Sequence, residues 1–135
     1  GGVRVAGHNN ESSATIKNCT ITNNYPYAIK AYGCSVNIIN SIIWDNEISN
    51  DGGEWEGGDG EFILTYTDNN EYDPQFTDSE HEDFTLQSTS PCIDAGDPNS
   101  ELDPDGTRAD MGAYYFHQTS CFQIKNLYFL GFYHL

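Results

Sequence analysis

A segment of this chain is repeated after 22 residues. Thr15–Asn24 (TIKNCTITNN) returns as Asn37–Asn46 (NIINSIIWDN), and the two copies align without a gap. A weaker third copy is expected at Phe62–Asn69, aligned so that Asn69 matches Asn46. A period this short, with alternating β-branched residues and asparagines at fixed places, is typical of a stacked β-solenoid. The repeat therefore predicts an all-β fold of short strands stacked rung on rung.

The matched asparagines have a structural explanation. Asn18 and Asn40 occupy the same place in the two copies. Asparagine tolerates the left-handed backbone region and hydrogen-bonds its own backbone at bends. In adjacent rungs, Asn18 and Asn40 are also expected to share side-chain amide hydrogen bonds as a ladder. We therefore assign these residues to turns rather than to catalysis.

The charge balance argues against two kinds of partner. The 135 residues contain 21 Asp and Glu against five Lys and Arg, which gives a formal net charge of −16. Binding to phosphate groups needs clustered Lys and Arg, so neither nucleic acid nor an anionic lipid surface is an expected partner. No segment is long and apolar enough to span a bilayer, so membrane insertion is not expected either. The acids suit a solvated secreted surface or the binding of cations.

The four cysteines carry no metal motif. Cys19, Cys34, Cys92 and Cys121 lack CxxC spacing, so a zinc site is not expected. Cys19 takes the position that Ser41 fills in the next copy, which predicts a small buried packing residue. A disulfide stays open, because the sequence identifies no pair.

The chain divides into three regions by composition. Residues 1–89 are expected to form the parallel rungs, interrupted at residues 48–61 by a loop rich in glycine and acids. Residues 90–117 contain prolines and scattered apolar residues. They are expected to form a loop-rich C-terminal cap over the open end of the last rung. Residues 118–135 form an apolar tail that matches neither region.

The start of the chain is interpreted as the end of an earlier rung. Val3 and Val5 alternate with Arg4, which predicts a strand, and neither a Met nor a signal-peptide pattern precedes them. We therefore interpret the chain as part of a longer secreted protein, whose remainder would be its first partner. The first rung would then carry an unpaired edge that is prone to pairing.

Four segments resemble a known group of proteins. They are NSIIWDN (40–46), DPQF (73–76), DFTLQSTSPCIDAGDP (83–98) and DPDGTRADMGAYYF (103–116). In this order, within Thr15–Phe116, they resemble the C-terminal end of secreted bacterial right-handed parallel β-helix proteins of the pectate-lyase-like superfamily. The chain departs from that pattern at Tyr115, where the group usually has Glu, and in its tail.

The resemblance implies a right-handed parallel β-helix at an extracellular or cell-surface location. Some relatives are polysaccharide lyases or glycoside hydrolases, but a fold does not by itself confer activity. We therefore expect a structural, adhesive or carbohydrate-interacting segment with no catalysis of its own. The alternative is a fragment of a polysaccharide lyase or glycoside hydrolase whose active site lies mostly in upstream rungs.

The cap is rich in aspartates that suit a hard cation. Calcium binds several oxygen ligands from carboxylates and carbonyls. The candidate ligands are Asp94, Asp97, Asp103, Asp105 and Asp110. The alternative, which we favour, is that these carboxylates accept hydrogen bonds from backbone amides in turns and pair with Arg108 in a buried fork.

Aromatic residues beside asparagines and aspartates suggest sugar binding, because they offer flat apolar faces to sugar rings. The candidates are Tyr25, Tyr27, Trp44 and Trp55, with Asp45 as a partner for sugar hydroxyls. For Trp44 the alternative is packing under the loop at 48–61. A polysaccharide is therefore the expected ligand.

A pair of carboxylates could serve a hydrolase. Asp45 and Asp68 are expected at aligned rung positions, and stacked strands lie about 4.8 Å apart. We favour the alternative that both are turn residues in a solvated stack, and assign no catalytic residue.

Overall fold

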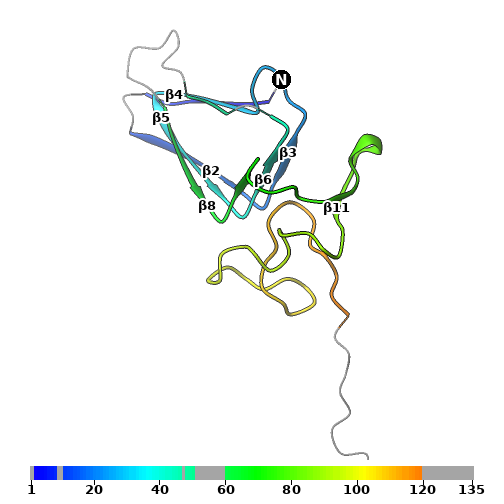
Figure 1. Ribbon diagram of the computed structural model, residues 1–135. Helices are drawn as coiled ribbons and strands as arrows, with labels where there is room; N and C mark the ends of the chain where they lie inside the picture. The colour runs from blue at the N-terminus through cyan, green and yellow to red at the C-terminus, as the bar shows by residue number, and fades with distance from the viewer. Residues whose placement is uncertain (1, 9–10, 47, 51–59, 120–135) are drawn as a thin grey trace, which may run out of the picture.

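Parallel strands dominate the described part of the chain, which comprises residues 2–8, 11–46, 48–50 and 60–119 of a computed structural model. The strands are arranged in three sheets of three, which lie along the sides of a triangle (Figure 1). The first sheet contains β1 (Val3–Ala6), β4 (Ile29–Tyr32) and β7 (Ile48–Asn50); the second contains β2 (Ser12–Lys17), β5 (Cys34–Ile39) and β8 (Glu61–Thr65); the third contains β3 (Thr20–Thr22), β6 (Ile42–Trp44) and β9 (Asp68–Asn69). All neighbours within these sheets are parallel. The chain thus visits each sheet once per rung, in three rungs. Among the described residues, no helix has the length and apolar character needed to cross a membrane.

The 22-residue repeat is confirmed as the register of the first two rungs. Ile16 pairs with Ile38, and Ile21 pairs with Ile43. The alignment predicted for the third copy is wrong, because Asn69 pairs with Ile43 rather than with Asn46. The added residues of that rung lie between β7 and β8. Ile48–Asn50, expected within a loop, forms β7, and Glu61 begins β8, while residues 51–59 lie outside the described residues.

Alternation of inward and outward side chains builds the core of the stack. Ile29, Val36, Ile38 and Ile43 are fully buried between the three sheets. Burying a side chain of this kind contributes about 1.5–3 kcal/mol relative to leaving it exposed. Branched residues also fit the pleated surface of a strand. The middle rung therefore supplies most of the core, because both of its neighbours cover it.

A single left-handed residue turns the chain from the second sheet to the third. Asn18, Asn40 and Tyr66 have φ of 52°, 49° and 49° at this corner. The turn assignment of the two asparagines is therefore correct. The ladder predicted between them is wrong: the Asn40 amide instead donates to Ser100 Oγ at 3.1 Å and accepts from the Asp97 N–H at 2.7 Å.

The residue after each bend closes the corner through its side chain. Cys19, Ser41 and Thr67 each donate to the carbonyl two residues earlier, at 3.2, 2.8 and 3.1 Å. Cys19 is therefore a half-buried corner residue and not a buried packing residue. Cys19, Cys34 and Cys92 are free thiols, and Cys121 lies outside the described residues.

The region after β9 leaves the parallel arrangement. Phe76–Asp78 (β10) and Asp83–Leu86 (β11) form an antiparallel hairpin around a short 3-10 helix at Ser79–His81. The expectation of parallel rungs up to residue 89 is therefore wrong for this pair. Phe76 and Phe84 pack edge to face across the hairpin, with ring centroids 5.3 Å apart. Residues 90–117, the cap, contain no strand.

The cap lies beside the stack rather than over its end (Figure 1). It contacts every rung at one corner. The Ala113 N–H donates to Thr20 Oγ1 at 3.0 Å, and the Gly112 N–H donates to the Asn40 carbonyl at 2.9 Å. The expected cover of the last rung is therefore wrong.

Outward-facing apolar residues of β6 explain this position. Ile42 is buried with Phe76, Leu86, Cys92 and Met111, and Trp44 packs against this cluster. Ile43 faces the interior of the stack instead. Because β6 is apolar on both faces, its outer face needs a cover, and the cap and hairpin supply it.

Replacement of Ile42 by Ala measures how much the packing of β6 against the cap contributes to stability. Deleting a buried isoleucine leaves a cavity, so we expect the free energy of unfolding to fall by about 2–5 kcal/mol. Ile63→Ala, at an exposed position on β8, is the matched control and should change it by less than about 0.5 kcal/mol. Denaturant unfolding of both variants measures the difference. Equal effects would show that the cap does not depend on β6.

Candidate functional site

The corner that follows the third sheet gathers amide and carboxylate side chains from successive rungs. Asn23, Asp45 and Asn70 adopt left-handed backbone conformations there, with φ of 56°, 53° and 55°. Asn and Asp are the residues other than glycine that tolerate this region best. The Asp45 N–H donates to Asn70 Oδ1 at 2.7 Å. Three rungs thus present polar groups at one edge.

An asparagine ladder holds this corner. Asn24 and Asn46 each donate from Nδ2 to the carbonyl two residues earlier, at 2.8 and 2.6 Å. The backbone N–H of Asn24 donates to Asn46 Oδ1 at 2.8 Å, and Asn24 Nδ2 donates to the same oxygen at 3.1 Å. Asn46 also donates to the Ile21 carbonyl. An amide ladder thus joins Asn24 with Asn46, one corner away from Asn18 and Asn40, for which it was predicted.

An open depression of about 690 Å³ lies at this corner. Its lining residues are Asn23, Asn24, Tyr25, Pro26, Asp45, Asn46 and Asn70. Tyr25 is 87% exposed, so its ring is accessible to a ligand. The depression thus combines an aromatic face, several amides and a single carboxylate.

The structure brings together two of the five predicted sugar-binding residues. Tyr25 and Asp45 line the depression. Tyr27 does not, and the Lys30 ammonium lies over its ring, 4.9 Å from the centroid. Trp44 packs against the cluster between β6 and the cap. Residues 51–59 of the loop lie outside the described residues, so its packing under that loop stays a prediction. Trp55 lies outside the described residues.

The asparagines of the depression were missed as ligand-binding candidates. Asparagines beside the aromatic residues were expected to serve sugar binding, but Asn23, Asn46 and Asn70 were not named individually. The signal that could have found them is the row of turn residues next to Tyr25-Pro26, since side chains at a stacked corner collect at one edge.

The expected alignment of Asp45 with Asp68 is wrong, and so the two carboxylates do not form a pair. The favoured assignment of both residues to turns in a solvated stack is also wrong for Asp68, which lies in β9. Asp68 pairs in register with Ile42 and is only 3% exposed, whereas Asp45 lies at the solvated corner. Asp68 Oδ1 accepts from the N–H groups of Glu71 and Tyr72 at 3.0 and 3.1 Å, while its buried Oδ2 has no hydrogen-bond partner. Burial raises the pKa of Asp68, since it disfavours the charged form.

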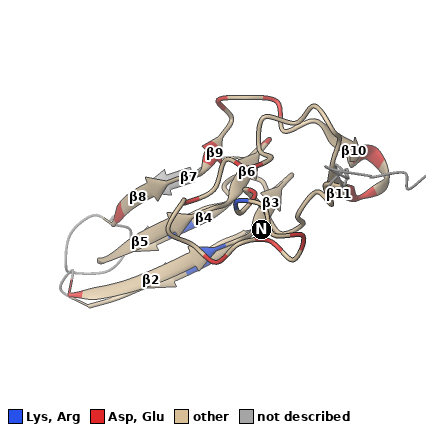
Figure 2. Cartoon of the chain, turned by 90° about the horizontal axis from the view of Figure 1, so that it is seen from below, with Lys and Arg blue, Asp and Glu red and all other residues tan. Residues whose placement is uncertain are grey.

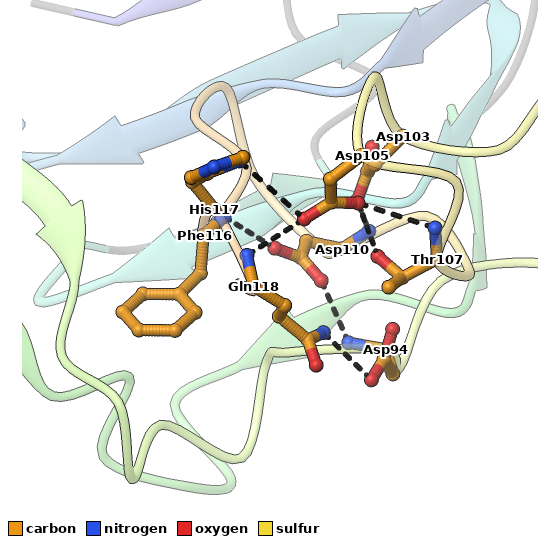
Figure 3. Close-up of polar contacts among 8 residues, drawn as sticks. All are labelled: Asp94, Asp103, Asp105, Thr107, Asp110, Phe116, His117 and Gln118. Carbon is orange, nitrogen blue, oxygen red and sulfur yellow. Dashed lines mark hydrogen bonds and ion pairs between the residues drawn. The ribbon is translucent and has the colours of Figure 1, made fainter. Parts of the chain in front are cut away.

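Four of the five candidate aspartates of the cap accept hydrogen bonds from backbone amides, and Figure 3 shows three of these four. Asp110 accepts from the N–H groups of Asp94 and Phe116 at 2.7 and 2.6 Å. Asp103 accepts from the Asp110 N–H at 2.9 Å. Asp105 accepts from the Gln118 N–H at 2.7 Å. Asp97 Oδ1 also accepts from the Asn99 N–H at 2.9 Å. Asp94 differs: its Oδ2 accepts from the Gln118 side-chain amide at 2.9 Å, and its buried Oδ1 has no hydrogen-bond partner. The cap has no strands to pair its backbone N–H groups, so aspartate side chains accept hydrogen bonds from them instead.

The fork predicted between Arg108 and a carboxylate is wrong. Arg108 Nε donates to the Gly96 carbonyl at 2.7 Å, and Nη2 donates to the same oxygen. The guanidinium also lies over the Tyr66 ring, 5.7 Å from its centroid. Arg108 therefore connects two parts of the cap through the Gly96 carbonyl, and contacts the third rung through the Tyr66 ring.

The environment separates the pKa values of the cap carboxyls. Burial raises the pKa of Asp110 and of Asp103. The hydrogen bond from the Gln118 N–H, with those from Thr107, lowers the pKa of Asp105. Within the described ranges, no three His, Cys, Asp or Glu side chains are arranged to hold a metal ion. Calcium binding stays a hypothesis, and the geometry favours the amide-bonded alternative.

Thermal melting with calcium tests that hypothesis directly. Because four of the five candidate carboxylates already accept hydrogen bonds from backbone N–H groups, we expect the same melting temperature in millimolar calcium and in chelator. Asp105→Asn is the reference variant, because it removes one candidate ligand and should lower the melting temperature equally with and without calcium. A rise in melting temperature that needs calcium and is lost in Asp105→Asn would establish a cation site.

Replacement of Asp68 by Asn tests the buried carboxylate. Because the folded pKa values of Asp68 and Asp110 are raised, the folded state binds protons more tightly than the unfolded chain, and stability increases as pH falls toward these values. Asn keeps the acceptor for the N–H groups of Glu71 and Tyr72 and removes the charge. We expect Asp68→Asn to be more stable than the wild type at neutral pH. We also expect its free energy of unfolding to increase less than that of the wild type when the pH is lowered.

Urea unfolding at neutral pH and near pH 5 measures both effects. The lowered pKa of Asp105 makes the folded state less stable on acidification, but only below the ordinary aspartate pKa of about 3.9. Measurements between neutral pH and pH 5 therefore do not include this opposite effect. Glu80→Gln, at an exposed position that does not contribute to the raised pKa of Asp68, is the control and should leave the pH dependence unchanged. A loss of stability at neutral pH in Asp68→Asn would contradict the expectation.

A comparison with known families gives one match. The family model described as right handed beta helix region matches residues 1–101. No curated protein and no solved structure matches significantly. The match covers all three parallel sheets and the start of the cap, in agreement with the all-β architecture. The chain belongs to the right-handed beta helix family.

Proposed function

We propose that this chain is a carbohydrate-interacting segment of an extracellular or cell-surface protein, and that the corner depression is its sugar site. In this proposal the parent protein is a right-handed parallel β-solenoid of the pectate-lyase-like superfamily, of bacterial origin. The remainder of the parent stack is its structural partner, and a polysaccharide is its ligand.

The observation that carries the proposal is the grouping at the corner. Tyr25 offers a nearly fully exposed aromatic face, which suits the apolar face of a sugar ring. Asp45, Asn23 and Asn70 lie around it and offer acceptors and donors for hydroxyl groups. The rungs stack about 4.8 Å apart, so equivalent groups recur along the corner. A repeating ligand suits such a row better than a compact one.

The composition supports the proposed location. The net charge of −16 favours a well-solvated surface. Among the residues that line the depression, Asp45 carries a negative charge and none is a base. Both the net charge and this lining disfavour a ligand with many negative charges. We therefore propose a neutral polysaccharide.

The enzyme alternative finds less support in these residues. A glycoside hydrolase of the usual kind needs two carboxyl groups across its cleft. Among the residues that line the depression, Asp45 is the single acid. The alternative therefore places an active site in upstream rungs of a longer parent protein.

A glycan array followed by titration tests the proposal. We expect the wild type to bind neutral polysaccharides and Tyr25→Ala to lose about tenfold in affinity, which corresponds to about 1.4 kcal/mol. Asp45→Asn should weaken binding less, since an amide still offers an oxygen acceptor.

Tyr114→Ala is the matched control, because Tyr114 is an exposed tyrosine on the cap, away from the depression. It should bind like the wild type. Binding that survives in Tyr25→Ala, or an array without any bound glycan, would overturn the proposal. Cleavage of a polysaccharide by the chain itself would favour the enzyme alternative.

A further inference from the structure

Three Asp–Pro peptide bonds lie in the described part of the chain, at residues 73–74, 97–98 and 103–104. Such a bond can break without an enzyme, because the side-chain carboxyl is able to close a five-membered ring on the carbonyl carbon of its own residue. Proline also makes the bond a tertiary amide, whose nitrogen leaves once it is protonated. The three bonds differ in what surrounds the carbonyl, the carboxyl and the proline.

The carbonyl of the Asp103–Pro104 bond is already polarised. The Gly106 N–H donates to the Asp103 carbonyl oxygen at 2.8 Å, and the Asp103 N–H donates to the Thr107 carbonyl at 3.0 Å, which closes a tight turn around Pro104. A backbone N–H at this place stabilises the negative charge that develops on the oxygen when a nucleophile adds to the carbon. Pro104 is exposed, so water and protons reach this turn.

The Asp103 carboxyl has one oxygen open for attack. Its Oδ2 accepts from the Asp110 N–H at 2.9 Å (Figure 3), and Oδ1 has no hydrogen bond to any described residue. Because Oδ2 is an acceptor there, the proton of the neutral carboxyl belongs on Oδ1. One oxygen therefore anchors the side chain, and the other carries the proton that the leaving nitrogen needs.

Negative charge around this carboxyl favours its neutral form. Figure 2 shows acidic residues on the loops of the cap and hairpin, whereas β1 to β6 contain none. Burial, together with the charges of Asp94, Asp105 and Asp110, raises the pKa of Asp103. Glu101, another acid, lines a small depression with it. The neutral acid therefore persists to a higher pH than in an ordinary aspartate.

The other two Asp–Pro bonds lack this combination. Asp97 Oδ1 accepts from both the N–H and the side-chain amide of Asn99, at 2.9 and 3.2 Å. Both donors bind the ionised carboxylate, so they oppose the neutral form that the reaction needs. At the third bond, Pro74 is fully buried, and no described N–H donates to the Asp73 carbonyl.

We propose that this protein cuts its own chain between Asp103 and Pro104 in mildly acidic solution. Oδ1 of the neutral Asp103 carboxyl attacks the carbonyl carbon of the same residue, and a cyclic anhydride forms. The bond from that carbon to the Pro104 nitrogen breaks, and the carboxyl proton passes to the nitrogen, which becomes a new amino terminus. Water then opens the anhydride, so the first piece ends at Asp103 with two carboxyl groups.

The cut leaves the cap docked on the stack. The N–H groups of Gly112 and Ala113, which lie beyond the cut, still donate to the Asn40 carbonyl and to Thr20 Oγ1. The piece that begins at Pro104 would therefore be released only when these contacts break. The proposal is independent of the sugar site, which lies at another corner.

Mass spectrometry of the denatured products tests the proposal. The chain is incubated at neutral pH and in the most acidic buffer in which circular dichroism shows the native fold. In acid we expect two pieces, one ending at Asp103 and one beginning at Pro104. They should form at least about tenfold faster than cleavage products of the other two Asp–Pro bonds. In urea at the same pH, where the turn is lost, the three bonds should break at similar rates.

Substitutions remove separate parts of the reaction. Asp103→Asn keeps an acceptor for the Asp110 N–H but has no carboxyl, so this cut should disappear. Asp103→Glu keeps the acid but needs a larger ring, and the rate should fall at least about tenfold. Asp97→Asn is the matched control and should leave the cut at Asp103 unchanged. If Asp103→Asn does not fold, Pro104→Ala replaces the tertiary amide with an ordinary one and should slow the cut.

Several results would overturn the proposal. A folded chain that stays intact in acid would show that the fold does not promote the reaction. Equal rates at the three bonds in the folded chain, or the same preference in urea, would show that the turn does not select this bond. A cut that survives in Asp103→Asn would assign the cleavage to a contaminating protease.

Discussion

In-register stacking of like residues is the constraint on which the rest of the structure depends. Parallel strands pair Ile16 with Ile38 and Ile21 with Ile43, so each inward isoleucine packs against another one rung away. Burial of these columns fixes the register, because a slip by one residue would turn every side chain to the other face. Corners then repeat at fixed places, and turn residues collect along the edges of the stack.

The sequence predicts the stack well where the repeat is regular. The shift of 22 residues is the register of the first two rungs, and the bends at Asn18 and Asn40 follow from asparagine chemistry. The third rung could not be aligned from asparagines, because the inward residues decide its register and added residues separate β7 from β8. The cap position was open to prediction, since the run from Ile42 to Trp44 is apolar at every residue, which indicates a strand covered on both faces.

The candidate site was predictable in part. Tyr25 and Asp45 could be named because aromatic and acidic residues stand out in a turn, and they do line one depression. Asp68 could not be separated from Asp45 in the sequence, because only the register shows that one is buried beside Ile42 and the other lies at a corner. The metal hypothesis rested on composition, and composition does not reveal that backbone N–H groups already donate to four of the five candidate carboxylates.

Asn40 has a consequence for how the molecule unfolds. Stacked repeats usually lose their terminal units independently, because each unit contacts only its neighbours. Here a single asparagine offers its carbonyl, its side-chain oxygen and its side-chain amide to Gly112, Asp97 and Ser100, respectively. The cap also reaches the rungs on either side, at Thr20 and Tyr66. Fraying of one rung would therefore break contacts shared by all three, which converts a linear array into one cooperative unit.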